Sequence, residues 1–280
     1  MLKNGKLLEI SPCVRVQIPA TLTDHSERIY ETCTVFSTDW GIVLSRVVVV
    51  NGSAKMEKGN TALVLAPLLD GMREAGASVE LFYAKRLNVK PCTGEFHCWN
   101  KKPGECYIDD DMQVLYPKLR EADILVLATP VYIPLPGEMQ NLINRLCPLV
   151  EQILEFRDGR TRARFHDDVN IRKIVLVSTC GWWEMGNFGT VLRIAEELAK
   201  DVSVEFAGAV LRPHAYLMVE NKEKAKKVTK ALREAGYELV KKGRMSKSLL
   251  EVISQPLVSE EEYRCSLNEG YEKVKSGEKD

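Results

Sequence analysis

Short apolar runs recur along this chain and alternate with amphipathic stretches, and they constrain its fold more than any other feature. The clearest run is Arg46-Val47-Val48-Val49-Val50, which Asn51-Gly52-Ser53 ends. A β-branched run of this length is too short for a buried helix, and its lack of polar alternation is typical of a parallel strand covered on both faces. Similar runs occupy 78–83, 123–128, 171–177 and 202–207. We therefore expect five core strands.

The stretches between these runs carry helical periodicity. We expect helices over 62–75, 137–156, 187–200 and 221–242, the first with Pro67 inside it. Strands that alternate with helices predict an α/β fold, in which helices cover both faces of a doubly wound parallel sheet.

Two segments fall outside this alternation, so we divide the chain into three parts. Residues 1–45 form an N-terminal extension with one strand-like segment, Val14–Ile18, and 46–243 form the α/β domain. Residues 244–280 form a C-terminal helical arm. In that arm Ser259 and Glu262 have the spacing of a capping box, which predicts the start of a further helix.

Composition and charge exclude several classes of protein. The 280 residues carry 39 Lys plus Arg and 39 Asp plus Glu, so the net charge is zero. This balance argues against a nucleic-acid binder with a basic face, and against a strongly acidic carrier. No apolar run approaches the roughly 18 residues of a membrane span, and Met1–Pro12 has no continuous apolar stretch. We therefore expect no signal peptide, no membrane partner and a cytoplasmic location.

The loop after the first strand has the composition of a phosphate site. It runs from Asn51 to Thr61, carries Gly, hydroxyl and amide side chains, and leads into a helix N-terminus. Free backbone amides and the helix dipole favour an anion there. Neither a Walker loop nor Gly-x-Gly-x-x-Gly is present, so a single phosphate monoester fits better than a dinucleotide. The alternative is an ordinary strand-to-helix turn.

Two further loops follow strands at the same predicted edge of the sheet. Thr129–Gly137 holds three prolines and Tyr132, and such a stiff apolar loop suits a flat aromatic ligand or a plain rigid turn. Ser178–Asn187 holds Trp182 and Trp183 side by side. Adjacent tryptophans are costly to expose, so we expect them to pack on a ligand, a partner subunit or a lid.

Several motifs in these loops resemble one known family. They are Gly52-Ser53 with Gly59-Asn60-Thr61, then Cys92-Thr93-Gly94-Glu95-Phe96-His97-Cys98-Trp99, then Cys106 with Asp109-Asp110-Asp111-Met112, then Thr129-Pro130-Val131-Tyr132. In this order they resemble the NADPH-dependent FMN reductase family, closest to the branch that includes the iron–sulfur flavoproteins. The resemblance covers about 46–215 and implies a flavodoxin-like sheet with strand order 2-1-3-4-5.

The resemblance implies that FMN binds at these loops. Ser53, Asn60 and Thr61 would hold its phosphate, Pro130, Val131 and Tyr132 would line the ribityl chain and ring, and 179–181 would close the other side. Lys55 is added because its charge offsets that of the phosphate. The whole set of expected cofactor-binding residues is Ser53, Lys55, Gly59, Asn60, Thr61, Thr129, Pro130, Val131, Tyr132, Ile133, Thr179, Cys180, Gly181 and Trp182. No catalytic side chain is assigned, because the flavin itself carries the chemistry.

The family's iron–sulfur branch carries a compact Cys-x-x-Cys-x-x-Cys motif and a fourth Cys downstream. Here Cys92, Cys98 and Cys106 occupy three of the positions, and Glu95 stands at the second. Three interpretations stay open: an iron–sulfur cluster with Glu95, His97 or a small molecule as fourth ligand; a zinc ion on the three cysteines and His97; or a metal-free loop that serves as structure or as a lid beside the flavin. The scattered Cys13, Cys33, Cys147 and Cys265 are interpreted as structural, and His25, His166 and His214 as ordinary histidines.

The resemblance favours an FMN-dependent NAD(P)H oxidoreductase that passes electrons to a quinone, a flavin, a metal or a protein. One alternative is an iron–sulfur flavoprotein that exchanges single electrons with a ferredoxin-like partner, and another is a non-redox FMN-binding protein. The resemblance also implies a homodimer or homotetramer. We expect the arm from Arg244 onward to dock on a neighbouring subunit.

Overall fold

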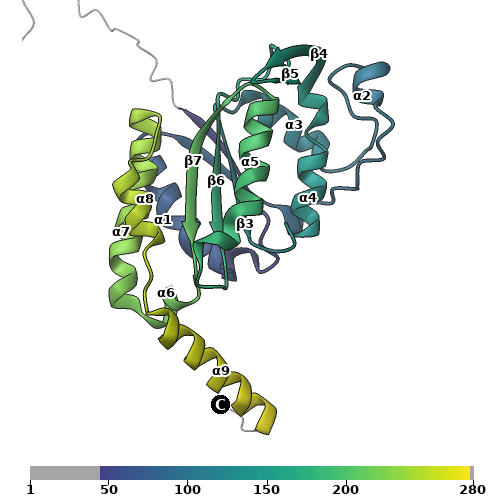
Figure 1. Cartoon of the computed structure of the whole chain (residues 1–280). Coiled ribbons are helices and arrows are strands. Elements are labelled where there is room, and N and C mark those ends of the chain that lie inside the picture. The colour runs from purple at the N-terminus through teal and green to yellow at the C-terminus, as the bar shows by residue number, and fades with distance from the viewer. Residues whose placement is uncertain (1–44, 278–280) are drawn as a thin grey trace, which may run out of the picture. The chain divides into compact units, whose positions relative to one another are not determined.

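The core is a five-stranded parallel sheet. The computed structural model describes residues 45–277. Its sheet consists of β1 (Arg46–Asn51), β2 (Ser78–Tyr83), β3 (Ile124–Pro130), β6 (Lys173–Thr179) and β7 (Glu205–Arg212), in the order β2-β1-β3-β6-β7 (Figure 1). In terms of core strands this is the order 2-1-3-4-5, so the flavodoxin-like prediction is confirmed. The last strand begins three residues later than predicted and runs on to Arg212.

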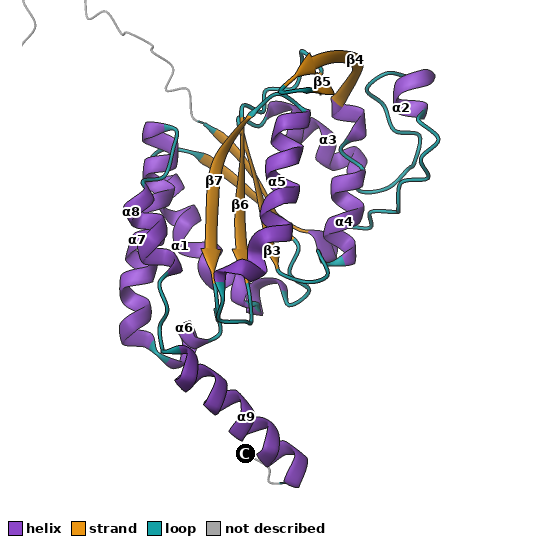
Figure 2. Cartoon of the chain, viewed as in Figure 1, coloured by secondary structure: helices purple, strands orange, loops and turns teal. Residues whose placement is uncertain are grey.

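Side chains along the central strands alternate between two buried faces. Val47 and Val49 pack into one apolar cluster, and Val48 and Val50 pack into a second. Helices α1 (Asn60–Glu74), α7 (Lys222–Lys242) and α8 (Lys247–Ser254) cover the first face. Helices α3 (Met112–Glu121), α4 (Gly137–Asn144) and α5 (Gly189–Asp201) cover the other (Figure 2). The unbroken valine run thus follows from burial on both sides.

Two glycines allow α1 and α7 to pack backbone to backbone. A Cβ added at Gly71 would lie 1.8 Å from the carbonyl oxygen of Arg233, and one at Gly236 would lie 2.0 Å from that of Leu68. No side chain fits into such spaces, so the close crossing of the two helices depends on both glycines.

The predicted helix over 137–156 is wrong in its second half. Helix α4 ends at Asn144, a 3-10 turn, η3 (Cys147–Leu149), follows, and Val150–Arg157 forms β4, paired antiparallel with β5 (Arg160–Phe165). Pro148 has no backbone N–H and cannot continue the helix. The turn between the strands is Asp158-Gly159, both residues with positive φ, which is the geometry of a two-residue hairpin.

The remaining elements lie in the loops and at the C-terminus. They are α2 (His97–Asn100), α6 (Leu217–Glu220), α9 (Glu260–Ser276) and the 3-10 turns η1 (Met56–Lys58), η2 (Ala84–Arg86) and η4 (Met185–Phe188). The predicted capping box opens α9: Glu262 donates its backbone N–H to Ser259 Oγ, and the Ser259 backbone N–H bonds the Glu262 carboxylate.

None of the helices within 45–277 is long and apolar enough to cross a membrane. The strand-like segment Val14–Ile18 and the residues Cys13, Cys33 and His25 lie outside the described range.

Candidate functional site

The loops singled out from the sequence meet at the carboxyl edge of the sheet. Backbone hydrogen bonds join them across the strand ends: Gly52 N donates to Ala128 O at 2.7 Å, and Val131 N donates to Thr179 O at 2.8 Å. Carboxyl ends of parallel strands are where open α/β sheets bind ligands. The structure therefore brings together the three segments that begin at 51, 129 and 178.

The first of these loops is folded around buried polar groups. Ser53 is buried, and its backbone N–H donates to Asn51 Oδ1 at 2.9 Å. The amide nitrogen Nδ2 of the fully buried Asn51 finds no hydrogen-bond partner among the described residues. A Cβ at Gly59 would lie 2.4 Å from Ser53 Oγ, so any larger residue there would displace this hydroxyl. A buried amide donor without a partner marks a place where a ligand acceptor fits.

The N-terminus of α1 opens onto the same place. No side chain caps this helix at Gly59, so its first backbone N–H groups lack a side-chain acceptor. Thr61 Oγ1 and Thr179 Oγ1 lie 2.9 Å apart and are buried, which ties α1 to the end of β6. Lys55 and Asn60 are exposed beside them. Uncapped amides, hydroxyls and a lysine form a set that suits an anion.

The second and third loops present a mixed apolar surface. Thr129 is buried, and its hydroxyl donates to the carbonyl of Pro130 at 3.0 Å, while Pro130 and Val131 are half-buried. The large side chains of the set are exposed: Tyr132 by 52%, Ile133 by 101% and Trp182 by 62%. The remaining two differ, since Gly181 is exposed and Cys180 is buried. Burial raises the pKa of the Cys180 thiol, so this cysteine is not a reactive thiolate.

The C-terminal arm packs against this loop. Trp183 Nε1 donates to Val258 O at 3.1 Å, and the hydroxyl of Tyr263 donates to Gly181 O at 2.5 Å. Ile253 and Tyr263 are buried, whereas α9 is exposed beyond Tyr263. The arm therefore covers its own domain as far as Tyr263, and only its last helix projects outward (Figure 1).

A buried Arg212–His214 pair holds the arm in place. Arg212 Nη1 donates to Ile253 O and to Gln255 O, and Leu257 N donates to His214 Nε2 at 3.1 Å. Burial, with a smaller contribution from Arg212, lowers the pKa of His214 to about 4. Burial likewise lowers the pKa of Arg212 to about 10. The sequence pattern around His214 is that of an ordinary histidine, and only the fold brings this residue beneath the 180–183 loop.

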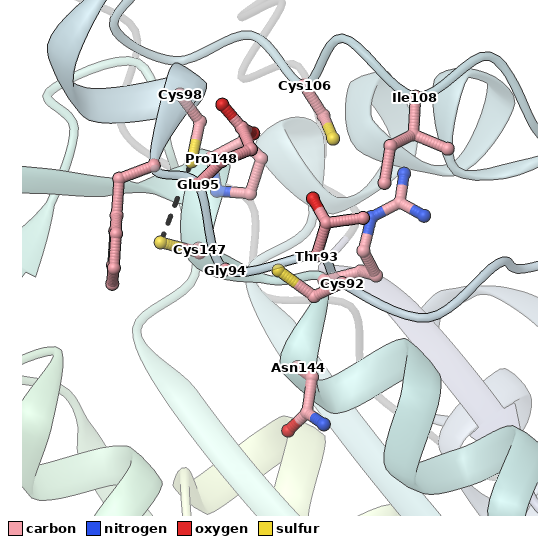
Figure 3. Close-up of a pocket in the computed structure, with 12 residues that line it drawn as sticks. Cys92, Thr93, Gly94, Glu95, Cys98, Cys106, Ile108, Asn144, Cys147 and Pro148 are labelled. Atoms are coloured by element: carbon pink, nitrogen blue, oxygen red, sulfur yellow. Dashed lines mark hydrogen bonds between the residues drawn. The ribbon is translucent and has the colours of Figure 1, made fainter.

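Away from this edge, the cysteine loop lines a cavity of about 310 Å³ with a largely apolar lining. Cys92, Cys98 and Cys106 all line it, as the spacing suggested, and so does Cys147 from η3 (Figure 3). The Sγ atoms of Cys98 and Cys147 lie 3.7 Å apart. Burial raises the pKa of both thiols, that of Cys147 to about 12. Cys147, one of the scattered cysteines interpreted as structural, thus lies with the motif cysteines in the fold.

A buried ion pair forms one wall of this cavity. Arg145 donates to Asp110 with two N–H groups, at 2.6 and 3.1 Å, and both side chains are almost fully buried. Arg145 also lines the cavity, and its Nε atom has no hydrogen-bond partner in the described part of the chain. A fixed cation with an unused donor therefore lies beside the four thiols.

The two sites are separated by the length of α4. This helix begins directly after the 129–136 loop and ends at Asn144, which lines the cysteine cavity together with Arg145. Its eight residues span about 12 Å from one site to the other. The cysteine cavity thus lies away from the carboxyl edge of the sheet. Within 45–277, no three Cys, His, Asp or Glu side chains are close enough together to hold a single metal ion.

Comparison with known proteins finds a family model that matches about half of the chain. Residues 45–182 match the family model described as NADPH-dependent FMN reductase. An iron–sulfur flavoprotein of Methanocaldococcus jannaschii is 32% identical over 105 residues, which cover 37% of this chain and 53% of that protein. An iron–sulfur flavoprotein of Archaeoglobus fulgidus is 31% identical over 101 residues, covering 36% and 48%. The matched part of the chain thus spans about half the length of these curated relatives.

Solved structures share the fold. An FMN-dependent NADH-azoreductase from Bacillus anthracis, in complex with FMN, superposes with a TM-score of 0.50 and 12% sequence identity, over 70% of this chain and 100% of that one. At this identity the likeness supports the flavodoxin-like architecture alone.

Proposed function

Because residues 45–182 match the model of the NADPH-dependent FMN reductase family, we propose that this chain binds FMN at the carboxyl edge of its sheet. It would use the flavin to pass electrons from NADH or NADPH to an acceptor. The observation that carries the proposal is the convergence of buried hydroxyls, an orphaned amide and an uncapped helix N-terminus at that edge.

The phosphate of FMN would bind at the N-terminus of α1. Ser53, Asn60 and Thr61 supply hydroxyl and amide groups there, and Lys55 adds a positive charge. The contact between Thr61 Oγ1 and Thr179 Oγ1, 2.9 Å apart, fixes the Thr61 hydroxyl in place before any ligand arrives. Donors that are already oriented cost less entropy on binding than flexible ones, which favours a tightly held phosphate.

The flavin ring would lie against the 129–133 and 179–182 loops. Tyr132, Ile133 and Trp182 are exposed at this edge, and covering such apolar side chains stabilises a flat aromatic ligand. The hydrogen bonds of the Tyr263 hydroxyl to Gly181 O and of Trp183 Nε1 to Val258 O hold the 179–182 loop against the arm. When bound, FMN would supply the redox chemistry, and the chain's own residues would orient it and exclude water.

The acceptor class in this proposal is a quinone, a flavin, a metal ion or a protein. The names of the relatives favour a second candidate, an iron–sulfur flavoprotein. In this candidate the chain would pass single electrons to a ferredoxin-like partner. The cysteine cavity is the structural feature behind this alternative. A homodimer or homotetramer is also part of the proposal, because Leu267, Tyr271 and Val274 form an exposed apolar stripe on α9.

We further place the protein in the cytoplasm. The cysteines within 45–277 are all free thiols, which agrees with a reducing compartment.

The test is a titration of the flavin-free protein with FMN, in which quenching of the flavin fluorescence reports binding. We expect one FMN per chain. Gly59→Ala should weaken binding about tenfold, or about 1.4 kcal/mol, because the new Cβ displaces Ser53 Oγ. Gly189→Ala is the matched control, since a Cβ there meets open space. A protein that takes up no FMN, or a Gly59→Ala variant with wild-type affinity, would contradict the proposal.

A further inference from the structure

We propose that Cys147 is the fourth thiolate ligand of an iron–sulfur centre whose other ligands are Cys92, Cys98 and Cys106. The sequence motif lacks a cysteine at position 95, and a carboxylate such as Glu95 is a harder ligand than iron–sulfur clusters usually have. In the folded chain, Cys147 on a different segment supplies the thiolate that the motif lacks at position 95. All four sulfur atoms line one cavity, with Cys147 directly beside Cys98 (Figure 3).

The two segments that carry these cysteines are fastened together independently of the thiols. Trp99, which follows Cys98, donates Nε1–H to the carbonyl of Val150, just after η3, at 2.9 Å. The guanidinium of Arg120 donates to Gly104 O at 2.9 Å and to Pro148 O at 3.3 Å. These bonds hold the 92–106 loop against η3 by contacts that involve no cysteine. The approach of Cys147 to the motif is therefore a feature of the fold.

The charge beside the cavity suits a group with thiolate ligands. A thiol binds a metal as its thiolate and releases its proton, so four ligands bring four negative charges. Arg145 is 1% exposed, lines the cavity and keeps its Nε–H without a partner among the described residues. That donor is available to a cluster sulfide or a cysteine sulfur, and hydrogen bonds to the sulfurs tune such centres.

The size of the cavity favours a polynuclear centre over a single ion. The cavity has a volume of about 310 Å³, whereas a single water molecule needs only about 10–15 Å³. No three ligand side chains in the described range are spaced for one ion, although the Cys98–Cys147 pair alone is close. Four thiolates around a wider space are the ligand set of a four-iron cluster.

The experiment measures iron, acid-labile sulfide, zinc and flavin in the full-length protein after anaerobic purification and reconstitution with iron and sulfide. We expect about four irons and four sulfides per chain, with an electron paramagnetic resonance signal after reduction. Cys147→Ser should lose more than half of the iron and keep its flavin. Cys265→Ser is the matched control, because this cysteine is exposed on α9, and it should keep both.

A rescue variant separates a ligand from a merely structural residue. Glu95 also lines the cavity, so Glu95→Cys in the Cys147→Ser background places a thiolate at the same space and should restore the iron and the signal. A structural role for Cys147 predicts no such rescue. The proposal is overturned if wild-type protein contains no iron, or contains zinc in place of iron. It is also overturned by a Cys98–Cys147 disulfide in the anaerobic protein, or by full iron content in Cys147→Ser. Flavin content reports on FMN binding separately, so the two proposals fail independently.

Discussion

The substitution Asp110→Asn removes one charge of the buried pair behind the cysteine cavity. The Asp110 carboxylate receives four hydrogen bonds. Two come from Arg145, at 2.6 and 3.1 Å, and two come from the backbone N–H groups of Lys90, at 2.9 Å, and Met112, at 3.0 Å. Its side chain is 0% exposed and that of Arg145 is 1% exposed. An asparagine has almost the same shape, but it has no charge and turns one of the two acceptor oxygens into an NH2 group that faces N–H donors.

The expected cost is about 3–5 kcal/mol of unfolding free energy, the usual penalty for leaving one member of a buried pair uncompensated. This is a large share of the roughly 5–15 kcal/mol by which native proteins are stable. Burial raises the pKa of Asp110, but the hydrogen bonds from Arg145, Lys90 and Met112 outweigh it and hold that pKa below the usual 3.8. The stabilisation by the ionised Asp110 is therefore fully present at pH 7. In wild type it is lost only as the pH falls through that lowered pKa.

The assay is urea unfolding at pH 7, followed by circular dichroism, for wild type, Asp110→Asn and Asp109→Asn. Asp109 is the matched control because it is exposed and its bond to Lys90 Nζ uses the backbone carbonyl. We expect the control to lie within about 0.5 kcal/mol of wild type. An Asp110→Asn variant equally close to wild type, with an unchanged denaturant slope, would refute the reasoning.

Three further substitutions test other parts of the fold. Gly71→Ala should cost about 1–3 kcal/mol by thermal unfolding, because its Cβ would meet Arg233 O, whereas Gly270→Ala, in open space on α9, should be neutral or slightly stabilising. The pKa of His214 is about 4 in the folded chain and 6.5 in the unfolded chain, so at pH 7 the folded state holds the ring neutral. Lowering the pH from 7 to 4 should therefore reduce the unfolding free energy of wild type by about 3 kcal/mol more than that of His214→Gln. Equal losses in the two proteins would count against this. Tyr263→Phe should cost about 1 kcal/mol by removing the bond to Gly181 O, and an unchanged stability would argue against this contact in solution.

The sheet could be predicted because its signal is local. Each core strand is an apolar run of a few residues, and burial on both faces makes the run continuous, as in Val47–Val50. The β4–β5 hairpin was missed because the apolar residues of 150–156 also fit a helical period. The dipeptide Asp158-Gly159 and Pro148 were the signals that favoured a hairpin.

The fourth cysteine of the cavity could not be predicted from the sequence. Spacing alone identifies Cys92, Cys98 and Cys106, which lie on one loop. Cys147 follows 41 positions after Cys106 and has no neighbouring metal motif, so its place beside Cys98 depends on how η3 packs on α2. His214 is similar, because its burial comes from the return of the C-terminal arm over β7, which leaves no mark in the local sequence.

The most direct test of the central claim is anaerobic reduction of the FMN-loaded protein in a stopped-flow spectrophotometer. Addition of NADPH or NADH should bleach the oxidised flavin absorbance by transfer of hydride to the flavin, and an added quinone should restore it. Flavin that binds but stays oxidised in the presence of both nucleotides would contradict the proposed reductase activity.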